Sequence, residues 1–261
     1  MILGAMNNPY KAIIPQIERF SNTGFKFLDM SAEWPEATPE QLLKSKAKIK
    51  DALSTAGFSV VGHTAWFLPY AHPYEKVRRE AIAELKKSFS ALAEFNAKTV
   101  TVHPEVFHFA YKNRAQFLSN ALDSLGELDE HARSIGTTLV FEAFDEATFT
   151  TEELKELFKA HPKIGFHLDV GHANMGAPKG ARIFSLLSLF KSRLMHVHAS
   201  DNDGRNDAHL PIGAGKIKWD EVCKAIKKAG YDKTITLEVF SQDVEYLEIS
   251  RRKFEEIWRR A

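Results

Sequence analysis

The sequence predicts one α/β domain, residues 1–261, folded as a (β/α)8 TIM barrel. Eight short runs of β-branched or apolar residues alternate with segments of helical periodicity along the whole chain. No Ser/Gly linker or low-complexity tract divides the chain, and its 261 residues match the length of roughly 250 that such a barrel requires. The alternative, an open doubly wound sheet, usually carries a Gly-rich phosphate-binding turn after its first strand, and Asn7-Asn8-Pro9 is not such a turn.

Each expected element has its own signal. The strands are expected at residues 2–6, 25–30, 59–63, 99–103, 137–142, 164–169, 194–198 and 234–238. Helical patterns fit residues 13–20, 39–56, 75–96, 113–135, 151–160, 180–190, 219–229 and 243–258, and the clearest apolar stripe is Val77, Ala81, Leu85, Phe89 and Leu92. Thr38 before Pro39 is typical of a helix start. Gly57, Gly136 and Gly230 are typical of helix ends.

The composition limits the classes of function. Lys and Arg total 35 and Asp and Glu total 34, so the formal charge of +1 lacks the basic surplus of a typical nucleic-acid-binding protein. The single cysteine, Cys223, excludes an internal disulfide and a Cys-based zinc site. The sequence contains no run of 18 apolar residues, so no membrane span is predicted. The N-terminus lacks the pattern of a signal peptide. We therefore expect a cytoplasmic protein without a membrane partner.

Side chains that bind divalent metals stand at the expected carboxyl ends of six consecutive strands. In a TIM barrel these ends converge on one mouth, where the active site lies. The nine candidates are His63, His103, Glu142, Asp169, His172, His198, Asp207, His209 and Glu238. One such residue is more often a capping or hydrogen-bonding group, but nine at the same end indicate a metal site. His167 and His196 lie one layer deeper and are expected to be packed, hydrogen-bonded core residues.

These segments resemble the xylose isomerase-like TIM barrel superfamily, which includes sugar phosphate isomerases and epimerases, ketose 3-epimerases and endonuclease IV. The resemblance is carried by GHTAWF at 62–67, VTVHPE at 100–105, LVFEAF at 139–144, FHLDVGHANMG at 166–176, HVHASDNDGRNDAHLPIGAG at 196–215 and ITLEVF at 235–240. They span most of the chain in the family's order, and the segment at 196–215 is the most specific.

The resemblance implies roles for the nine residues. In the isomerase and epimerase branch, one Mn²⁺, Mg²⁺ or Co²⁺ is held by residues that match Glu142, Asp169, His198 and Glu238, and the two glutamates also act as acid and base. In endonuclease IV the same four hold one zinc. Two further zincs are held there by residues that match His63 and His103, with Glu142 bridging, and His172, Asp207 and His209. All nine positions are retained, so the resemblance implies one to three divalent ions per chain, with Mn, Zn, Mg and Co as the candidates.

The loops favour the sugar branch. Residues 31–36 are acidic, and Glu33 and Glu36 would repel DNA phosphates. The loops after the third and fourth strands are rich in aromatic residues, including Trp66, which either wall a sugar pocket or pack on the barrel rim. Arg205 and Lys216, in the long loop 199–218, can hold one phosphate or a sugar hydroxyl but are too few for a DNA duplex.

We therefore expect a divalent-metal-dependent sugar or sugar phosphate isomerase/epimerase in which Glu142 and Glu238 move the proton. Trp66, Arg205 and Lys216 are its expected substrate contacts, and its partner is a small-molecule sugar of either kind. One alternative is an endonuclease IV-like trinuclear-zinc enzyme that hydrolyses phosphodiesters at abasic sites. Another is a non-catalytic barrel, or a lyase or hydrolase on the same scaffold. The oligomeric state is left open, and nucleic acid is expected only under the endonuclease alternative.

Overall fold

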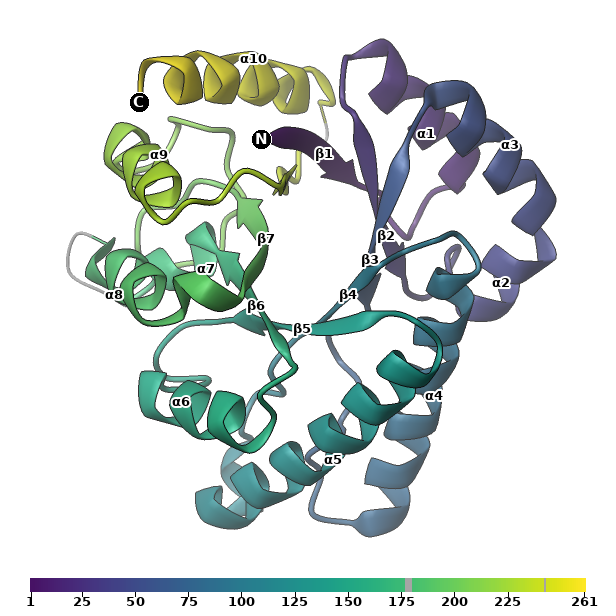
Figure 1. Cartoon of the computed structure of the whole chain (residues 1–261), viewed down its shortest axis with the longest axis vertical. Coiled ribbons are helices and arrows are strands. Elements are labelled where there is room, and N and C mark those ends of the chain that lie inside the picture. Colours follow the sequence, from purple (N-terminus) through teal and green to yellow (C-terminus); the bar gives the residue numbers. More distant parts are fainter. Residues whose placement is uncertain (177–179, 242) are drawn as a thin grey trace.

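Eight parallel strands close into a barrel in chain order in the computed structural model, which describes residues 1–176, 180–241 and 243–261. The strands are β1 (Ile2–Met6), β2 (Phe27–Ala32), β3 (Ser59–Thr64), β4 (Thr99–Val102), β5 (Thr138–Ala143), β6 (Gly165–Asp169), β7 (Leu194–Ala199) and β8 (Thr234–Leu237). β1 pairs with β8, with Ile2 beside Thr234, and this pairing closes the ring. Figure 1 shows the strands around a central axis with the helices outside them. The predicted (β/α)8 TIM barrel is confirmed.

The helices form the outer layer of the barrel. They are α1 (Ile13–Asn22), α2 (Pro39–Lys44), α3 (Lys46–Ala56), α4 (Glu75–Ala93), α5 (Arg114–Ser134), α6 (Thr151–Ala160), α7 (Val170–Asn174), α8 (Ala181–Phe190), α9 (Trp219–Lys228) and α10 (Glu245–Arg260). The described residues also include the 3₁₀ turns η1 (Phe109–Tyr111) and η3 (Lys191–Arg193). Among the described residues, no helix is both apolar enough and long enough to cross a membrane.

One helix prediction was wrong in detail, and one short helix was missed. The single helix expected over 39–56 is divided at Ser45, whose backbone (φ −101°, ψ 10°) leaves the helical region between α2 and α3. Serine has a lower helix propensity than alanine or leucine, and the apolar periodicity does not reveal such a break. The short helix α7 was not expected at all, because five residues are too few to display a period.

Buried apolar side chains fill the layer between strands and helices. On α4 the residues Ala81, Leu85, Phe89 and Leu92 are buried as expected, whereas Val77 at its first turn is 40% exposed. The helix boundaries follow their predicted signals. Thr38 forms a capping box with Gln41, and Gly57, Gly136 and Gly230 adopt positive φ. The outer core is thus conventional, and the polar residues inside the barrel are what distinguish this chain.

Candidate active site

All nine candidate ligands lie at the carboxyl end of the barrel. His63, Glu142, Asp169 and His198 belong to the ends of β3, β5, β6 and β7, and His103 and Glu238 directly follow β4 and β8. His172 lies in α7, and Asp207 and His209 lie in the loop 199–218. Contacts no longer than 4.0 Å between imidazole nitrogens and carboxylate oxygens connect all nine into one network. The structure therefore brings together every residue of the set.

Glu142 is the centre of the network. Its carboxylate is fully buried, with Oε2 3.2 Å from His103 Nε2 and 3.6 Å from His63 Nε2. Its Oε1 lies 2.8 Å from His172 Nδ1. Burial opposes the charge on Glu142, but the surrounding imidazoles outweigh burial and hold the pKa of this carboxyl well below its usual range. Glu142 is thus an ionised carboxylate shared by several ring nitrogens.

Three further ligand-type side chains meet beside Glu142. Asp169 on β6 is the neighbour of His198 on β7 in the sheet register, and His198 Nδ1 lies 3.7 Å from Asp169 Oδ2. The same nitrogen lies 3.1 Å from Glu238 Oε2. Burial raises the pKa of Asp169 to about 6. Burial acts in the same direction on Glu238, but His198 and His209 outweigh it and lower the pKa of Glu238 to about 2.

Asp207 connects His172 to His209 at the outer side of the cluster. Its Oδ2 lies 3.1 Å from His172 Nε2 and 3.0 Å from His209 Nε2. His209 has a φ of 42°, a left-handed conformation that residues other than glycine seldom adopt. Burial opposes the charge on His209, yet Glu238 and Asp207 raise its pKa to about 9. The loop thus accepts backbone strain to hold this ring beside two carboxylates.

The loop that carries Asp207 and His209 is fixed by Asp201. The buried carboxylate of Asp201 accepts the backbone N–H of Asn202, Gly213 and Ile217 and the indole N–H of Trp219, at distances between 2.8 and 3.2 Å. A short antiparallel bridge also joins Asp201 to Leu210. One buried side chain therefore organises most of the long loop 199–218.

The cluster contains buried polar atoms that have no hydrogen-bond partner among the described residues. They include both ring nitrogens of His63, Nδ1 of His103, Oε2 of Glu142 and Oδ2 of Asp169. Leaving such a group unpaired costs roughly 1–3 kcal/mol, so several at one place indicate a ligand that completes them. Five groups of described residues have three ligand atoms within 4.8 Å of one another. Four of them are drawn from the nine candidates: His63, Glu142 and His198; Glu142, Asp169 and His172; Asp169, His198 and Glu238; His172, Asp207 and His209. The fifth is formed by His198 with the deeper residues His167 and His196. The donor set of imidazoles and carboxylates suits Mn²⁺, Zn²⁺ or Co²⁺.

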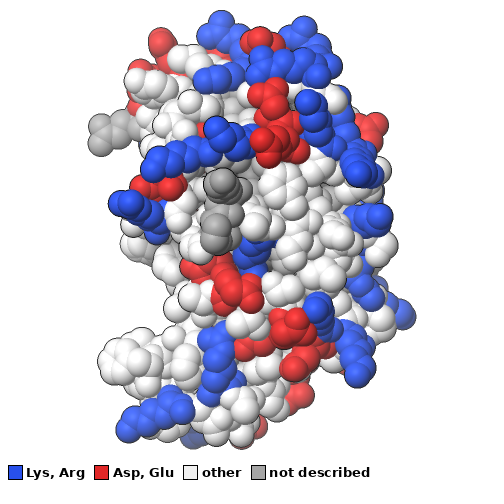
Figure 2. All heavy atoms as spheres, turned by 90° about the vertical axis from the view of Figure 1, so that its left-hand side faces the viewer, with Lys and Arg blue, Asp and Glu red and all other residues white. Residues whose placement is uncertain are grey.

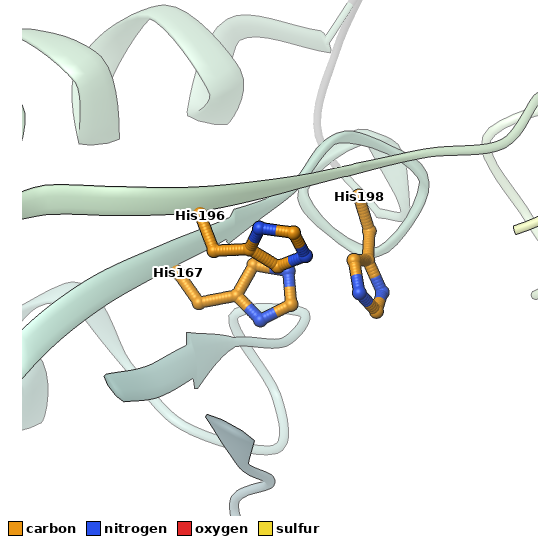
Figure 3. A group of neighbouring side chains, drawn as sticks. All are labelled: His167, His196 and His198. Atoms are coloured by element: carbon orange, nitrogen blue, oxygen red, sulfur yellow. The ribbon is translucent and has the colours of Figure 1, made fainter. Parts of the chain in front are cut away.

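A deeper layer of polar residues supports the ring of His198. His167 and His196 lie close to His198 inside the barrel (Figure 3), and all three rings are completely buried. His167 Nδ1 lies 3.1 Å from Thr101 Oγ1, and His196 Nδ1 lies 2.8 Å from Thr234 Oγ1. Burial lowers the pKa of both deeper imidazoles. This geometry agrees with the expectation of packed, hydrogen-bonded core histidines.

Asp29 is a functional candidate that sequence reasoning missed. It lies on β2, is fully buried, and its Oδ2 is 2.8 Å from His198 Nε2 and 3.0 Å from His196 Nε2. A carboxylate on the outer nitrogen of a metal-binding histidine fixes the ring orientation and its tautomer. The sequence does contain a signal that could have identified Asp29, because it is the one ionisable residue within the mainly apolar strand Phe27–Ala32. A buried charge there requires a partner.

A cavity of about 400 Å³ opens beside the cluster. Its walls include His63, His103, His172, Asp207, His209 and Glu238 from the candidate ligands, the aromatic residues Tyr10, Trp66, Phe144 and Phe240, and Asn8, Pro9, Glu33, Pro104 and Val106. Glu142, fully buried behind the imidazoles, is not one of the lining residues. The volume and the apolar walls are typical of a small-molecule site. Of Glu142 and Glu238, Glu238 is therefore the one that a bound molecule meets directly.

The three expected substrate contacts have different positions. Trp66 lines the cavity and is 59% exposed at its rim. Arg205 instead lines a separate cavity with Arg182 and Glu146, and the exposed Lys216 is not among the lining residues of the first cavity. The structure thus brings Trp66, but neither cation, to the candidate ligands, because the loop 199–218 directs Arg205 and Lys216 elsewhere. On the face in Figure 2, Lys and Arg are interspersed with Asp and Glu, without the continuous basic surface that a duplex would need.

The closed barrel and the carboxylate–imidazole cluster at its mouth define a TIM barrel with a candidate metal-dependent active site. The family model for the xylose isomerase-like TIM barrel matches residues 17–260. The chain therefore belongs to the xylose isomerase-like TIM barrel family, which confirms the resemblance inferred from its sequence.

Individual relatives support the same grouping. A protein of Methanocaldococcus jannaschii without a characterised function is 31% identical over 198 residues, which cover 70% of this chain and 67% of that protein. Fructoselysine 3-epimerase of Escherichia coli O157:H7 is 26% identical over 243 residues, covering 84% of this chain and 82% of the enzyme. Among solved structures, a D-tagatose 3-epimerase-like protein superposes with a TM-score of 0.87 at 23% identity, covering 100% of this chain and 99% of the other.

Proposed function

We propose that this protein is a divalent-metal-dependent sugar isomerase or epimerase. The observation that carries the proposal is the exposure of Glu238, within a cluster of metal-binding side chains, to a cavity of about 400 Å³ with aromatic walls. The names of the relatives support it, because both fructoselysine 3-epimerase and a ketose 3-epimerase of Arthrobacter globiformis are similar to this chain. The proposed partner is a small-molecule sugar. The cytoplasmic location and the single domain over residues 1–261 stay predictions.

Glu142, Asp169, His198 and Glu238 would hold the principal metal. Their contacts around His198 and the unpaired oxygens of Glu142 and Asp169 favour this set. Mn²⁺, Mg²⁺, Co²⁺ and Zn²⁺ are the candidates, with one to three ions per chain. A divalent cation bound there would polarise the carbonyl and hydroxyl oxygens of a sugar and acidify the hydrogen on the hydroxyl-bearing carbon next to the carbonyl.

The two glutamates have unequal access to a substrate. Glu238 borders the cavity and is ionised at neutral pH, so its carboxylate can accept a proton from a substrate carbon. Glu142 comes from β5, three strands away in the ring. Because Glu142 is ionised, it would have to take up a proton from solvent before it could return one on the opposite face of the substrate. Because Glu142 is fully buried, we propose Glu238 as the first base and Glu142 as its partner.

Hydrogen exchange with solvent tests this proposal. We expect the metal-loaded protein to exchange a carbon-bound hydrogen of at least one ketose in deuterated water. Glu238→Gln should reduce the rate by about a hundredfold to ten-thousandfold, because a carboxamide cannot accept the proton. The control is Glu221→Gln, which changes an exposed carboxylate on α9. Equal exchange by the wild type and the Glu238 variant would contradict the role of Glu238.

A second candidate function rests on the additional ligand group. His172, Asp207 and His209 place three ligand atoms within 4.8 Å of one another, apart from the principal set, as a multinuclear phosphodiesterase would require. Zinc-dependent nicking of abasic DNA, lost in Asp207→Ala, would support this candidate. Absence of nicking together with sugar exchange would reject it.

A further inference from the structure

The cavity beside the cluster is lined by carboxylates and, among the described residues, by no lysine or arginine. Asp207 and Glu238 belong to the candidate ligands, so a bound cation would neutralise part of their charge. Glu33 adds a third carboxylate that belongs to no ligand group. In the part of the cavity outside the candidate ligands, Glu33 is therefore the main charged group that a substrate meets.

Glu33 is held in this wall by backbone contacts. It follows β2, and its carbonyl oxygen accepts the N–H of Ala37 at 3.1 Å. The N–H of Glu36 donates to the carbonyl oxygen of Pro9 at 2.8 Å, which ties this loop to the loop after β1. The Glu33 side chain is half-buried, and burial raises the pKa of its carboxyl. No hydrogen bond or ion pair of this carboxylate is found among the described residues, so its oxygens are available to a ligand.

We propose that Glu33 selects unphosphorylated sugars by accepting hydrogen bonds from their hydroxyl groups and repelling a phosphate. This inference rests on the proposed function and narrows its substrate class. A half-buried carboxylate forms strong hydrogen bonds with hydroxyl donors. A phosphate group carries about −1.5 to −2 charges at neutral pH, and among the described residues no lysine or arginine lines this cavity to offset its repulsion from Glu33. The rings of Tyr10, Trp66 and Phe240 supply the apolar surface on which the C–H face of a neutral sugar packs.

A neighbouring cavity offers the opposite charge. It measures about 370 Å³, shares Asn8, Glu238 and Phe240 with the first cavity, and is also lined by Lys11 and Arg19. A phosphorylated substrate would have to place its phosphate there, next to α1. Asp243 lines the same cavity and offsets part of that positive charge. The charges therefore favour a neutral sugar, and a phosphate beside Arg19 is the competing outcome.

Calorimetric binding to the metal-loaded full chain tests the inference without requiring turnover. The probes are D-tagatose, D-psicose and D-fructose, each compared with its 6-phosphate. We expect the wild type to bind the neutral sugars at least about tenfold more tightly. Glu33→Ala should weaken binding of the neutral sugars by about ten- to hundredfold, because it removes hydrogen bonds to a charged acceptor. Glu33→Gln, which keeps the shape and removes the charge, should narrow the preference over the phosphates by about tenfold.

The matched control is Glu36→Gln on the same loop, because Glu36 is exposed and outside the lining of the cavity. This variant should keep the wild-type ratio between the affinity for each neutral sugar and the affinity for its 6-phosphate. The inference is overturned if the wild type binds the 6-phosphates more tightly than the neutral sugars, or if neither kind of sugar binds. It is also overturned if Arg19→Ala weakens binding of the 6-phosphates while the Glu33 variants leave the ratio of the two affinities unchanged. Sugar binding that depends on Glu33 without any hydrogen exchange would leave the inference standing and reject the proposed isomerase or epimerase activity alone.

Discussion

Asp29→Asn is expected to weaken both the metal site and the fold. The Oδ2 atom of Asp29 lies 3.0 Å from His196 Nε2, 2.8 Å from His198 Nε2 and 2.7 Å from Thr236 Oγ1. Burial opposes the charge on Asp29, but His196 and His198 outweigh it and hold the pKa of Asp29 well below its usual value. The carboxylate is thus ionised and bonded to three donors from two other strands.

The magnitude follows from these three bonds. A hydrogen bond to a charged group contributes about 1.5–3 kcal/mol and a neutral one about 0.5–1.5 kcal/mol. An asparagine that keeps its oxygen in place therefore loses roughly 1 kcal/mol per bond, or about 3 kcal/mol of the free energy of unfolding. His198 directs Nδ1 toward Asp169 and Glu238, so its orientation depends on the bond from Nε2 to Asp29. Removing such a partner typically costs 10–100-fold in metal affinity.

Two measurements check this expectation. Competition with a chromophoric chelator gives the affinity for Mn²⁺ or Zn²⁺, and urea denaturation of the metal-free protein gives the free energy of unfolding. Asp129→Asn is the matched control, because Asp129 is also buried but lies on α5, paired with Arg133 at 3.1 Å. It should lose stability without losing metal affinity. If Asp29→Asn binds the metal within twofold of the wild type, Asp29 does not orient His198.

Asp169→Ala should remove the principal metal, and full metal content and activity after dialysis would refute its assignment as a ligand. Glu153→Gln should lower stability by about 1 kcal/mol near pH 7, because Glu153 forms two 2.7 Å bonds with Arg114. Burial opposes the charge on Glu153, but Arg114 outweighs it and lowers its pKa. This stability is present above about pH 4.3, the usual value for the unfolded chain, and is lost as the pH falls through the lower folded-state pKa. The urea midpoints of variant and wild type should thus converge in acid, and a constant difference down to pH 2 would contradict the ion pair. Gly215→Ala should cost about 1–3 kcal/mol, since an added Cβ overlaps Asp201 and the backbone of Asn202. Gly230→Ala, where a Cβ meets nothing within 4 Å, should cost only about 1 kcal/mol, and equal losses in both would reject the argument for Gly215.

The strand-end residues were predictable because two regular features coincide. Parallel strands in a barrel share one carboxyl end, and alternate residues on a strand face the same side. On β7, this alternation predicts both that His198 faces the mouth and that His196 lies one layer deeper. The positions of Glu142 and Asp169 follow in the same way from β5 and β6.

Other features of the site depend on long-range geometry that local patterns do not contain. Asp29 meets His196, His198 and Thr236 across 167, 169 and 207 residues of chain, so nothing near Asp29 indicates its partners. Likewise, the path of the loop 199–218 decides that Arg205 faces a separate cavity. A sequence can show that a loop contains cations, but their direction depends on anchors such as Asp201.

The anchoring of the loop 199–218 by Asp201 has a consequence for binding entropy. Ordering one backbone residue costs about 1–2 kcal/mol, so a mobile loop of this length would oppose ligand binding strongly. Because Asp201 holds four N–H groups of the loop and its neighbour Trp219, this ordering is completed during folding. A cation or substrate that meets Asp207 and His209 then binds a preorganised surface, and more of its interaction energy remains as affinity.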